Sequence, residues 1–471
     1  MRIAGIVAEY NPFHNGHAHQ LSLLRAQGFD AVVCVCSPSV VQRGTAALLP
    51  TAVRTRAALL GGADLVLSLP APYAVLSAEG FAAAGVRLLS ALGICDVIAF
   101  GAENADTAQL MQAAAVLQSD AFAQRLQTQP ADGAPFAAVR AAVAEHLQPG
   151  LGALLSSPNN ILGVEYCKAL RTLAASGTQS ASGALLARPL ALPREGAPHD
   201  APLCARGAGC DCSGAGCDVF GAGCDVSGAN TNLHAHAAPG AQHGARPSDA
   251  AEYAARTAAP AAHAPLCASA TALRTLFLQR GAAALAPYVP AACLALYTQA
   301  AQRGLYADGA AFSTAVLSRL RAMRTEDFAA IRGINEGLEH RLAAAVAAAP
   351  TLDALYDALK TKRYAHARMR RLVLDAALGY TCALPAAVPY LHILGASETG
   401  LAVLRAAKST AALPRSQSLS QLAATRDAAR AVAKAHAAAE DLTALCLHAP
   451  QPQGSAYTQK FIGPNALPDA R

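Results

Sequence analysis

The first hundred residues alternate between short apolar runs and longer segments with helical spacing. The apolar runs are bounded by Gly, Pro or polar residues, as is typical of buried strands, and cover Ile3–Ala8, Ala31–Cys36, 65–69 and 97–100. The segments between them place apolar residues on one face of a helix and cover 17–27, Thr51–Leu60 and 77–92. Strands that alternate with helices of this length predict βαβ units and a parallel sheet covered on both faces.

The same pattern continues to about residue 192 and then changes. We expect a helix over 160–174 and a last strand over 184–192. Beyond Pro290 the spacing is helical almost throughout, although 388–395 fits either a strand or a loop. The end of the chain after Pro450 is rich in Pro, Gly and Gln, which predicts a poorly ordered tail.

Residues 200–267 interrupt this pattern with low-complexity sequence. Three tandem heptapeptides with a Gly-Ala-Gly-Cys-Asp core cover 207–227, and an Ala-, His- and Pro-rich stretch follows. A segment with so little apolar bulk cannot offset its ordering entropy, so we predict a disordered insertion. Its cysteines recur every seven residues at Cys210, Cys217 and Cys224, whereas zinc sites pair cysteines two to four residues apart. No metal site is therefore expected there.

Composition narrows the class of protein further. The formal net charge of +6 over 471 residues permits a nucleic-acid partner without requiring one. No uncharged apolar run is long enough to span a bilayer, and Glu9 interrupts the first apolar run too early for an export signal. We therefore expect a cytoplasmic protein.

The strongest chemical signal is the His14-Asn15-Gly16-His17 element that follows the first predicted strand. Histidines three apart at a helix start lie on one face, beside backbone N–H groups that attract anions. Fixed donors aimed at the charge that develops on a phosphate are the main source of catalysis in such reactions. His14 and His17 are therefore the candidate catalytic residues of a phosphate site, rather than an incidental pair.

A second element, at Ser269, reads as a capped helix start. Ser269 and Thr271 offer hydroxyl groups near backbone N–H groups, and Arg274 adds a positive charge one turn later. Ordinary helix caps have the same composition, so this element alone does not indicate a phosphate site. It supports one only in combination with the His14–His17 element.

A basic cluster near residue 365 predicts contact with nucleic acid. It carries an aromatic residue among its charges, and its candidate tRNA-binding residues are Lys362, Arg363, Tyr364, Arg368, Arg370 and Arg371. Basic side chains bind phosphates, and an aromatic ring can stack on an unpaired base. A solvated helix face would have the same charges, but a nucleotide site upstream favours RNA.

Taken together, these elements resemble the HIGH-motif nucleotidyltransferases and, more narrowly, the bacterial tRNA(Met) cytidine acetate ligase family. The matching stretches cover nearly the whole chain outside the insertion and lie at 7–17, 41–44, 62–70, 73–79, 100–103, 157–163, 268–274, 335–339 and 362–368. The resemblance implies a Rossmann-like, parallel-sheet nucleotidyltransferase domain of the α/β class, followed by a mostly α-helical C-terminal domain.

The resemblance also implies an activity. Such a ligase activates acetate with ATP and Mg²⁺ as acetyl-adenylate, and transfers the acetyl group to the wobble cytidine of elongator tRNA(Met). The residues that would bind ATP, with the Ser269 element added, are Val7, Ala8, Glu9, Tyr10, Asn11, Pro12, Phe13, His14, Asn15, Gly16, His17, Ala18, His19, Gln20, Gly101, Asn159, Arg194, Ser269, Thr271 and Arg274. This chain departs from the family's pattern in two loops, 37–40 and 45–51.

From these signals we expect five segments. Residues 1–199 bind ATP, 200–267 form the insertion, 268–290 complete the nucleotide site, 291–450 bind tRNA and 451–471 form a flexible tail. Two other functions stay open, namely a small-molecule adenylyltransferase and a non-catalytic RNA-binding protein on the same fold. The long basic helical region argues against the first, and the intact His14 and His17 argue against the second.

Overall fold

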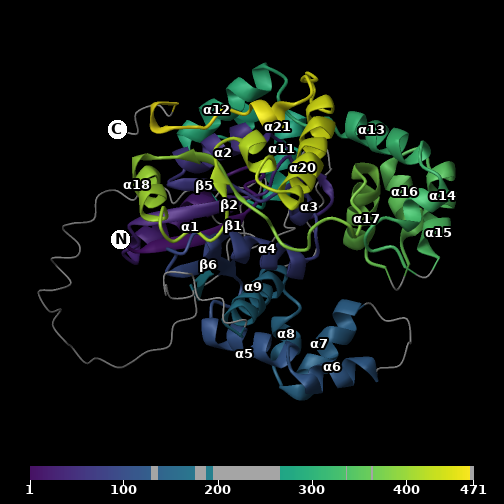
Figure 1. Ribbon diagram of the computed structural model, residues 1–471, viewed down its shortest axis with the longest axis horizontal. Helices are drawn as coiled ribbons and strands as arrows, with labels where there is room; N and C mark the ends of the chain where they lie inside the picture. The colour runs from purple at the N-terminus through teal and green to yellow at the C-terminus, as the bar shows by residue number, and fades with distance from the viewer. Residues whose placement is uncertain (129–135, 176–186, 195–265, 336, 362–363, 467–471) are drawn as a thin grey trace, which may run out of the picture.

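The computed structural model describes residues 1–128, 136–175, 187–194, 266–335, 337–361 and 364–466, and a seven-stranded sheet forms its centre (Figure 1). The strands lie side by side in the order β7-β6-β1-β2-β5-β8-β9. Their bounds are β1 Ile3–Ala8, β2 Ala31–Cys36, β5 Leu65–Ser68, β6 Val97–Ala102, β7 Arg188–Pro193, β8 Leu391–Ala396 and β9 Arg415–Ser416. From β7 to β5 all neighbours are parallel, so the expected α/β class with a mostly parallel sheet is confirmed.

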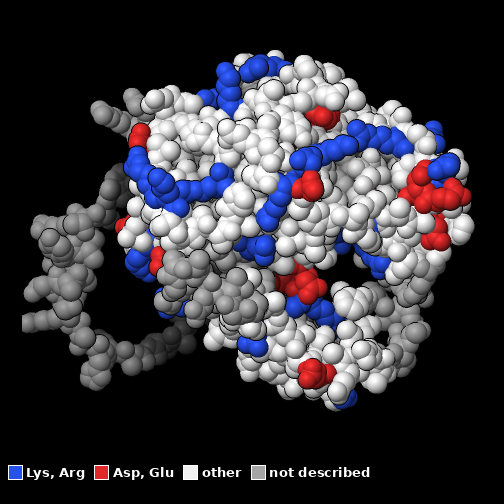
Figure 2. Space-filling model, in the orientation of Figure 1, with Lys and Arg blue, Asp and Glu red and all other residues white. Residues whose placement is uncertain are grey.

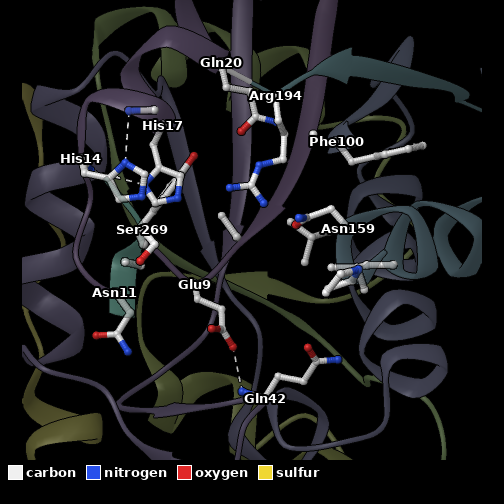
Figure 3. A pocket seen from close by; sticks show the side chains of 18 of the residues that line it. Glu9, Asn11, His14, His17, Gln20, Gln42, Phe100, Asn159, Arg194 and Ser269 are labelled. Carbon is white, nitrogen blue, oxygen red and sulfur yellow. Dashed lines mark hydrogen bonds between the residues drawn. The ribbon is translucent and has the colours of Figure 1, made fainter. Parts of the chain in front are cut away.

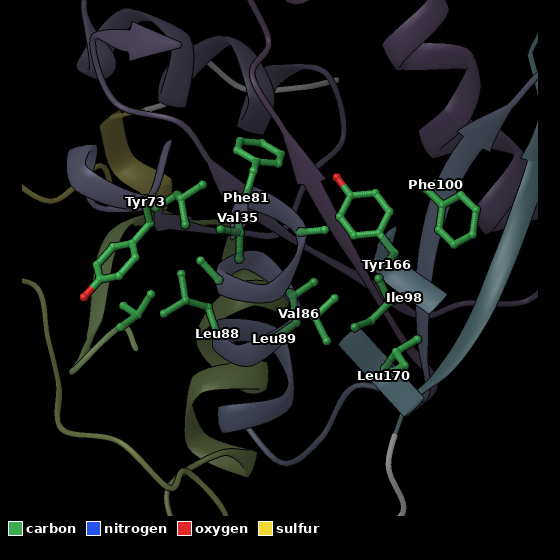
Figure 4. Packing of buried hydrophobic residues seen from close by; sticks show 14 of the residues in the cluster. Val35, Tyr73, Phe81, Val86, Leu88, Leu89, Ile98, Phe100, Tyr166 and Leu170 are labelled. Carbon is green, nitrogen blue, oxygen red and sulfur yellow. The ribbon is translucent and has the colours of Figure 1, made fainter. Parts of the chain in front are cut away.

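Helices cover both faces of this sheet because its central strands are apolar on both sides. Val33 and Val35 of β2 point into one core cluster, and Val32 and Cys34 point into the other. Helices α4 (Ala78–Ala91) and α9 (Pro158–Ala175) pack on the first face, where Figure 4 shows their side chains against the sheet. The opposite face is covered by α1 (Asn15–Ala26), α2 (Thr51–Leu60), α11 (Ala270–Arg280) and α12 (Ala291–Gln302).

The remaining elements are short or lie outside these two layers. They are β3 (Val40–Val41), β4 (Thr45–Ala46), α3 (Ala71–Ala74), α5 (Thr107–Leu117), α6 (Asp120–Gln127), α7 (Phe136–Leu147), α8 (Leu151–Leu154), η1 (Ala282–Leu285), α13 (Gly309–Arg321), α14 (Thr325–Ala329), α15 (Leu338–Ala348), α16 (Leu352–Leu359), α17 (His366–Leu378), α18 (Glu398–Ala406), α19 (Leu419–Ala423), α20 (Asp427–Leu445), α21 (Ser455–Thr458) and η2 (Pro464–Ala466). Strands β3 and β4 form an antiparallel hairpin that is separate from the main sheet. Helices α13 and α15–α17 share a third core cluster.

The order of the strands places a crevice beside β1. From β1 the chain proceeds to β2 and β5 on one side, and then returns to the other side of β1 at β6. In an open α/β sheet, ligands bind at the carboxyl ends of the strands where the order reverses in this way. The residues that follow β1 and β6 are therefore placed to form a site.

Residues 451–466 of the expected flexible tail lie among the described residues, whereas 467–471 lie outside them, so the flexibility of the tail stays a prediction. Ile462 bridges to Gly395 of β8, and the backbone of Ile462 both donates to Leu394 and accepts from Ala396. Ile462 and Ala456 are buried. Ile462 thus joins the edge of β8, which a polar composition does not reveal.

Residues 388–395, which fit either a strand or a loop, contain most of β8. This strand pairs antiparallel with β5, so the mostly helical C-terminal region also contributes to the sheet. The predicted insertion lies outside the described residues except for Leu266 and Cys267, and the domain boundaries stay a prediction. None of the helices in the described part of the chain is both long and apolar enough to cross a bilayer.

Two buried histidines in the C-terminal region predict that stability depends on pH. Burial lowers the pKa of His392 to about 3, with the neighbouring His436 as the second cause. Burial also lowers the pKa of His436, and its Nδ1 accepts a hydrogen bond from Ala71 N at 3.2 Å. The unfolded chain binds protons below about pH 6.5 while the folded protein does not, so the free energy of unfolding falls as pH falls below that value. We expect His392→Asn to lower the free energy of unfolding at pH 8. The difference in this free energy between the wild type and the variant should narrow by about 2 kcal/mol at pH 5. Urea unfolding at both pH values measures this, and a gap that does not change with pH would show that His392 titrates normally.

Candidate functional site

A cavity of about 340 Å³ lies at the carboxyl ends of β1, β6 and β7 (Figure 3). Residues of the turn after β1, the β3–β4 hairpin, the start of α9 and the start of α11 also line it. The cavity thus joins segments that are up to 267 positions apart in sequence, from Val7 to Arg274. It is the site that the strand order predicts.

The two histidines of the motif hold each other in place at the start of α1. His14 is the N-cap, and its Nδ1 accepts from Gly16 N at 3.1 Å, while Nδ1 of His17 accepts from His14 N at 3.3 Å. Their rings stack with centroids 3.9 Å apart. Because Nδ1 is an acceptor in both rings, the ring proton of each lies on Nε2.

Burial keeps both imidazoles neutral. It lowers the pKa of His14 to about 4, with Arg194 as the second cause, and it lowers the pKa of His17 well below its usual value. Near neutral pH the cavity therefore contains two uncharged Nε2–H donors. Such donors stabilise negative charge without having to lose a proton first.

The backbone before the histidines is shaped by contacts to distant segments. Tyr10 has a φ of +46°, unusual for a residue with a Cβ, and its buried ring lies edge-on to His17 with centroids 4.8 Å apart. Asn15 Nδ2 donates to the carbonyls of Leu266 and Pro287, each at 3.1 Å. The start of α1 is thereby held against the chain that follows the insertion.

The α11 start brings a cation to the same wall. Ser269 caps the helix through its Oγ, which accepts from Ala272 N at 3.2 Å. Arg274 donates to Asn11 O at 2.9 Å and to Thr271 Oγ1 at 3.0 Å, and burial lowers the pKa of its guanidinium. Ser269 and Arg274 line the cavity, whereas Thr271 instead holds Arg274.

The facing wall comes from β6, β7 and α9. Gly101 leaves room for Arg194, because a Cβ on Gly101 would lie 3.1 Å from Cγ of Arg194. Asn159 donates through Nδ2 to Glu103 Oε1, which fixes the amide at the cavity wall. Figure 3 shows Asn159 across the cavity from His14 and His17, with the guanidinium of Arg194 between them.

Most of the predicted nucleotide-binding residues line this cavity, and a few do not. Pro12, Phe13, Asn15, Ala18 and Thr271 lie behind the wall, where Phe13 packs against Gly61. These five support the site by packing or hydrogen bonding, because the turn between β1 and α1 directs only some of its side chains outward.

Sequence reasoning missed two parts of the cavity wall. The first is the β3–β4 hairpin, whose 41–44 segment matched the family without an assigned role. The second is an apolar patch, made of Phe81, Phe100, Leu162 and Tyr166. Apolar side chains in α4, α9 and β6 look like ordinary core positions, and only the tertiary structure shows that these face a cavity.

The predicted tRNA-binding residues on and before α17 are only partly exposed. Tyr364 is only 8% exposed and lies under the guanidinium of Arg368, at 4.6 Å, so its ring packs within the protein, and its expected stacking on a base stays a prediction. Arg370 lies over the ring of Tyr356, and burial lowers the pKa of Arg371. Lys362 and Arg363 lie outside the described residues.

Helix α17 directly abuts the hairpin of the cavity. Gly44 has a φ of +75°, and a Cβ there would lie 2.6 Å from the backbone of Arg370 and 2.7 Å from that of Arg371. Only glycine permits this approach. The basic helix therefore packs directly against a hairpin that lines the cavity.

Comparison with known proteins gives consistent matches. The HIGH Nucleotidyl Transferase family matches residues 1–179 and 251–458. A tRNA(Met) cytidine acetate ligase of Latilactobacillus sakei is 32% identical over 426 residues, covering 88% of this chain and 87% of the relative. One of Acetivibrio thermocellus is 40% identical over 182 residues, or 37% of this chain and 44% of the relative.

A solved structure has the same fold. The crystal structure of Thermotoga maritima TmcAL bound with alpha-thio ATP has a TM-score of 0.76 at 21% identity, covering 98% of this chain and 100% of the other.

Proposed function

The chain belongs to the HIGH nucleotidyl transferases and, within them, to the tRNA(Met) cytidine acetate ligase family, and we propose that the cavity catalyses both steps of that ligation. In the first step, acetate attacks the α-phosphorus of ATP to give acetyl-adenylate and pyrophosphate. In the second, the exocyclic amine of the wobble cytidine of elongator tRNA(Met) attacks the acetyl carbonyl. The products are N4-acetylcytidine and AMP.

The observation that carries the proposal is the set of donors around the cavity. The Nε2–H groups of His14 and His17 lie on one wall, Arg274 reaches the same turn through Asn11 O, and the guanidinium of Arg194 lies between the histidines and Asn159. Attack on an α-phosphate builds negative charge on its equatorial oxygens, and acetate is already a sufficient nucleophile. The reaction therefore needs fixed positive and N–H groups more than a base.

We propose that Mg²⁺ enters with ATP rather than through a preformed protein site. The described residues contain no group of three or more His, Cys, Asp or Glu side chains that would hold a metal ion. Magnesium in nucleotide enzymes is commonly held by substrate phosphates together with one or two carboxylates. The ion would neutralise the pyrophosphate leaving group.

The tRNA is proposed to lie over α17 and the neighbouring C-terminal helices. Figure 2 shows Lys and Arg side chains in bands over α18 and α20 and toward α13. The exposed basic residues on these helices, or just after α18 in the case of Lys408, are Arg319, Arg321, Arg405, Lys408, Arg430 and Lys434. Because α17 abuts the hairpin of the cavity, an RNA held there has its anticodon near the acetyl-adenylate.

One experiment separates this function from the alternatives. The protein is incubated with labelled acetate, ATP and bulk tRNA, and label on RNA and release of AMP are measured. We expect acetyl groups on tRNA in proportion to AMP. Transfer of AMP to a phosphorylated metabolite would indicate an adenylyltransferase, and tight tRNA binding without ATP turnover would indicate an RNA-binding protein.

A charge test addresses the tRNA surface. The double variant Arg368→Gln with Arg370→Gln is expected to raise the Kd for tRNA about tenfold and to flatten its salt dependence, because two phosphate contacts are lost. Acetate-dependent ATP–pyrophosphate exchange should stay unchanged. Arg188→Gln is the matched control, since that exposed residue begins β7 at the opposite end of the sheet. An equal effect of the control on tRNA affinity would argue against a surface at α17.

A further inference from the structure

Glu9 is the only acidic residue among the described residues that line the cavity. It directly follows β1, and Figure 3 shows its carboxylate on the side of the cavity where Gln42 lies, below the histidines and Asn159 in this view. A negative charge there opposes the binding of a triphosphate. Fixed N–H and guanidinium donors bind the phosphates of ATP, whereas a carboxylate binds a cation or a ligand that offers hydrogen-bond donors.

The carboxylate is held in a fixed orientation from the hairpin side. Its Oε1 accepts from Gln42 N at 2.7 Å, and the backbone carbonyl of Glu9 accepts from the buried Arg54 at 2.6 Å. No described residue donates a hydrogen bond to Oε2. One oxygen thus orients the group, and the other remains for a ligand.

A second unused group lines the same cavity as Glu9. The Tyr166 hydroxyl is buried, lines the cavity and has no hydrogen-bond partner among the described residues. Glu9 is close enough to contribute to the raised pKa of that hydroxyl, after burial as the larger cause. In Figure 4 the hydroxyl points away from the apolar side chains of Ile98 and Leu170. A buried donor without a partner is costly unless a ligand satisfies it.

Glu9 lies between the histidines that are proposed to bind ATP and the hairpin that packs against α17, where the tRNA is proposed to bind. Gln42, which holds the carboxylate, belongs to the hairpin that packs against α17 through Gly44. His14 and His17 lie on a different wall. A base that enters from the α17 side therefore meets Glu9 before it reaches the phosphate-binding groups.

We propose that Glu9 is the residue that receives the exocyclic amine of the cytidine, with Tyr166 as a second contact to the same base edge. This assignment rests on the proposed function. Oε2 accepts one N4–H and directs the nitrogen lone pair at the acetyl carbonyl. As the C–N bond forms and the bond from the carbonyl carbon to the AMP oxygen breaks, the N4 proton passes to Glu9 and AMP leaves with the electron pair.

The same two groups distinguish cytidine from uridine. Cytosine presents an N4–H donor beside the N3 acceptor, which complements a carboxylate and a hydroxyl. Uracil presents the O4 acceptor beside an N3–H donor, so its O4 would face the carboxylate without a proton between them. A carboxylate that accepts from N4 is a recurrent means of recognising cytosine.

The test separates the two steps in a Glu9→Gln variant. Glutamine keeps an oxygen for Gln42 N but loses the charge and the proton acceptor. We expect acetate-dependent ATP–pyrophosphate exchange within about threefold of the wild type, and acetyl transfer to tRNA at least about 100-fold slower. The variant should also lose the preference for wobble cytidine over uridine in a binding competition. Tyr166→Phe should slow transfer about tenfold and leave exchange unchanged.

The matched control is Glu79→Gln, which removes a carboxylate that is 69% exposed and paired with Lys168, near the cavity but outside it. Normal exchange in each variant also shows that it is folded. A parallel loss of exchange and transfer in Glu9→Gln, with an altered Mg²⁺ requirement, would overturn the proposal in favour of a metal ligand. Unchanged transfer would overturn it outright. Absence of exchange in the wild type would instead contradict the proposed function.

Discussion

Replacing His17 with asparagine is expected to lower acetate-dependent ATP–pyrophosphate exchange by about 10³-fold, with tRNA affinity unchanged. Asparagine offers an oxygen that can still accept from His14 N, so the helix start keeps its hydrogen bond. What is lost is the neutral Nε2–H donor. Removal of one preorganised donor from a site of this type costs about 10²–10³ in rate, and the stacked ring of His14 loses its support as well.

The measurement pairs exchange kinetics with tRNA binding. The variant His14→Asn should have a similar effect, and the double variant should be little worse than either, because the two rings act as one unit. If tRNA affinity falls in parallel with exchange, the assignment of His17 to ATP activation and of α17 to RNA binding is wrong.

Replacing Arg54 with methionine is expected to destabilise the protein by about 3 kcal/mol and to impair the cavity from behind. The side chain is 2% exposed, and it donates to Leu49 O at 3.0 Å, to Glu9 O at 2.6 Å and to Pro38 O. The carbonyl of Glu9 follows β1, that of Pro38 follows β2 and that of Leu49 precedes α2. Without the guanidinium, all three are left buried and unpaired.

Arg54→Lys is the informative companion variant. An ammonium on a flexible stem cannot serve three carbonyls in the planar arrangement of a guanidinium, so we expect an intermediate loss of stability. Since the chain has no tryptophan, urea unfolding is best followed by circular dichroism. A wild-type midpoint and a wild-type exchange rate in Arg54→Met would show that the three segments hold their positions without it.

Local pattern predicted the central sheet well. The expected strands at Ile3–Ala8 and Ala31–Cys36 and the helix at Thr51–Leu60 have the same bounds in the structure. Parallel strands covered on both faces must be apolar at every position, and such runs are unmistakable when Pro, Gly or charged residues bound them. The cap at Ser269 was predictable because capping depends on residues within one turn.

Long-range pairing was not predictable in the same way. Strand β8 pairs with β5 across more than 300 positions, and Ile462 bridges to Gly395 of β8. A short apolar run has no local feature that identifies the strand with which it pairs. A polar C-terminal segment likewise has no local feature that shows where it packs. Each of these pairings depends on a strand that offers unpaired backbone groups from a distant part of the chain.

The sequence by itself determined that a His-x-Gly-His element follows the first strand of a nucleotide-binding sheet. Its spacing and its strand context are local properties. Tertiary structure alone decided the charge and the role of the groups around it. The pKa of His14 falls because distant segments bury it and bring Arg194 close, and Glu9 is oriented by a hairpin that follows another strand. Charge state and orientation depend on the solvent and dipoles that surround a group, and those are set by contacts between residues far apart in the chain.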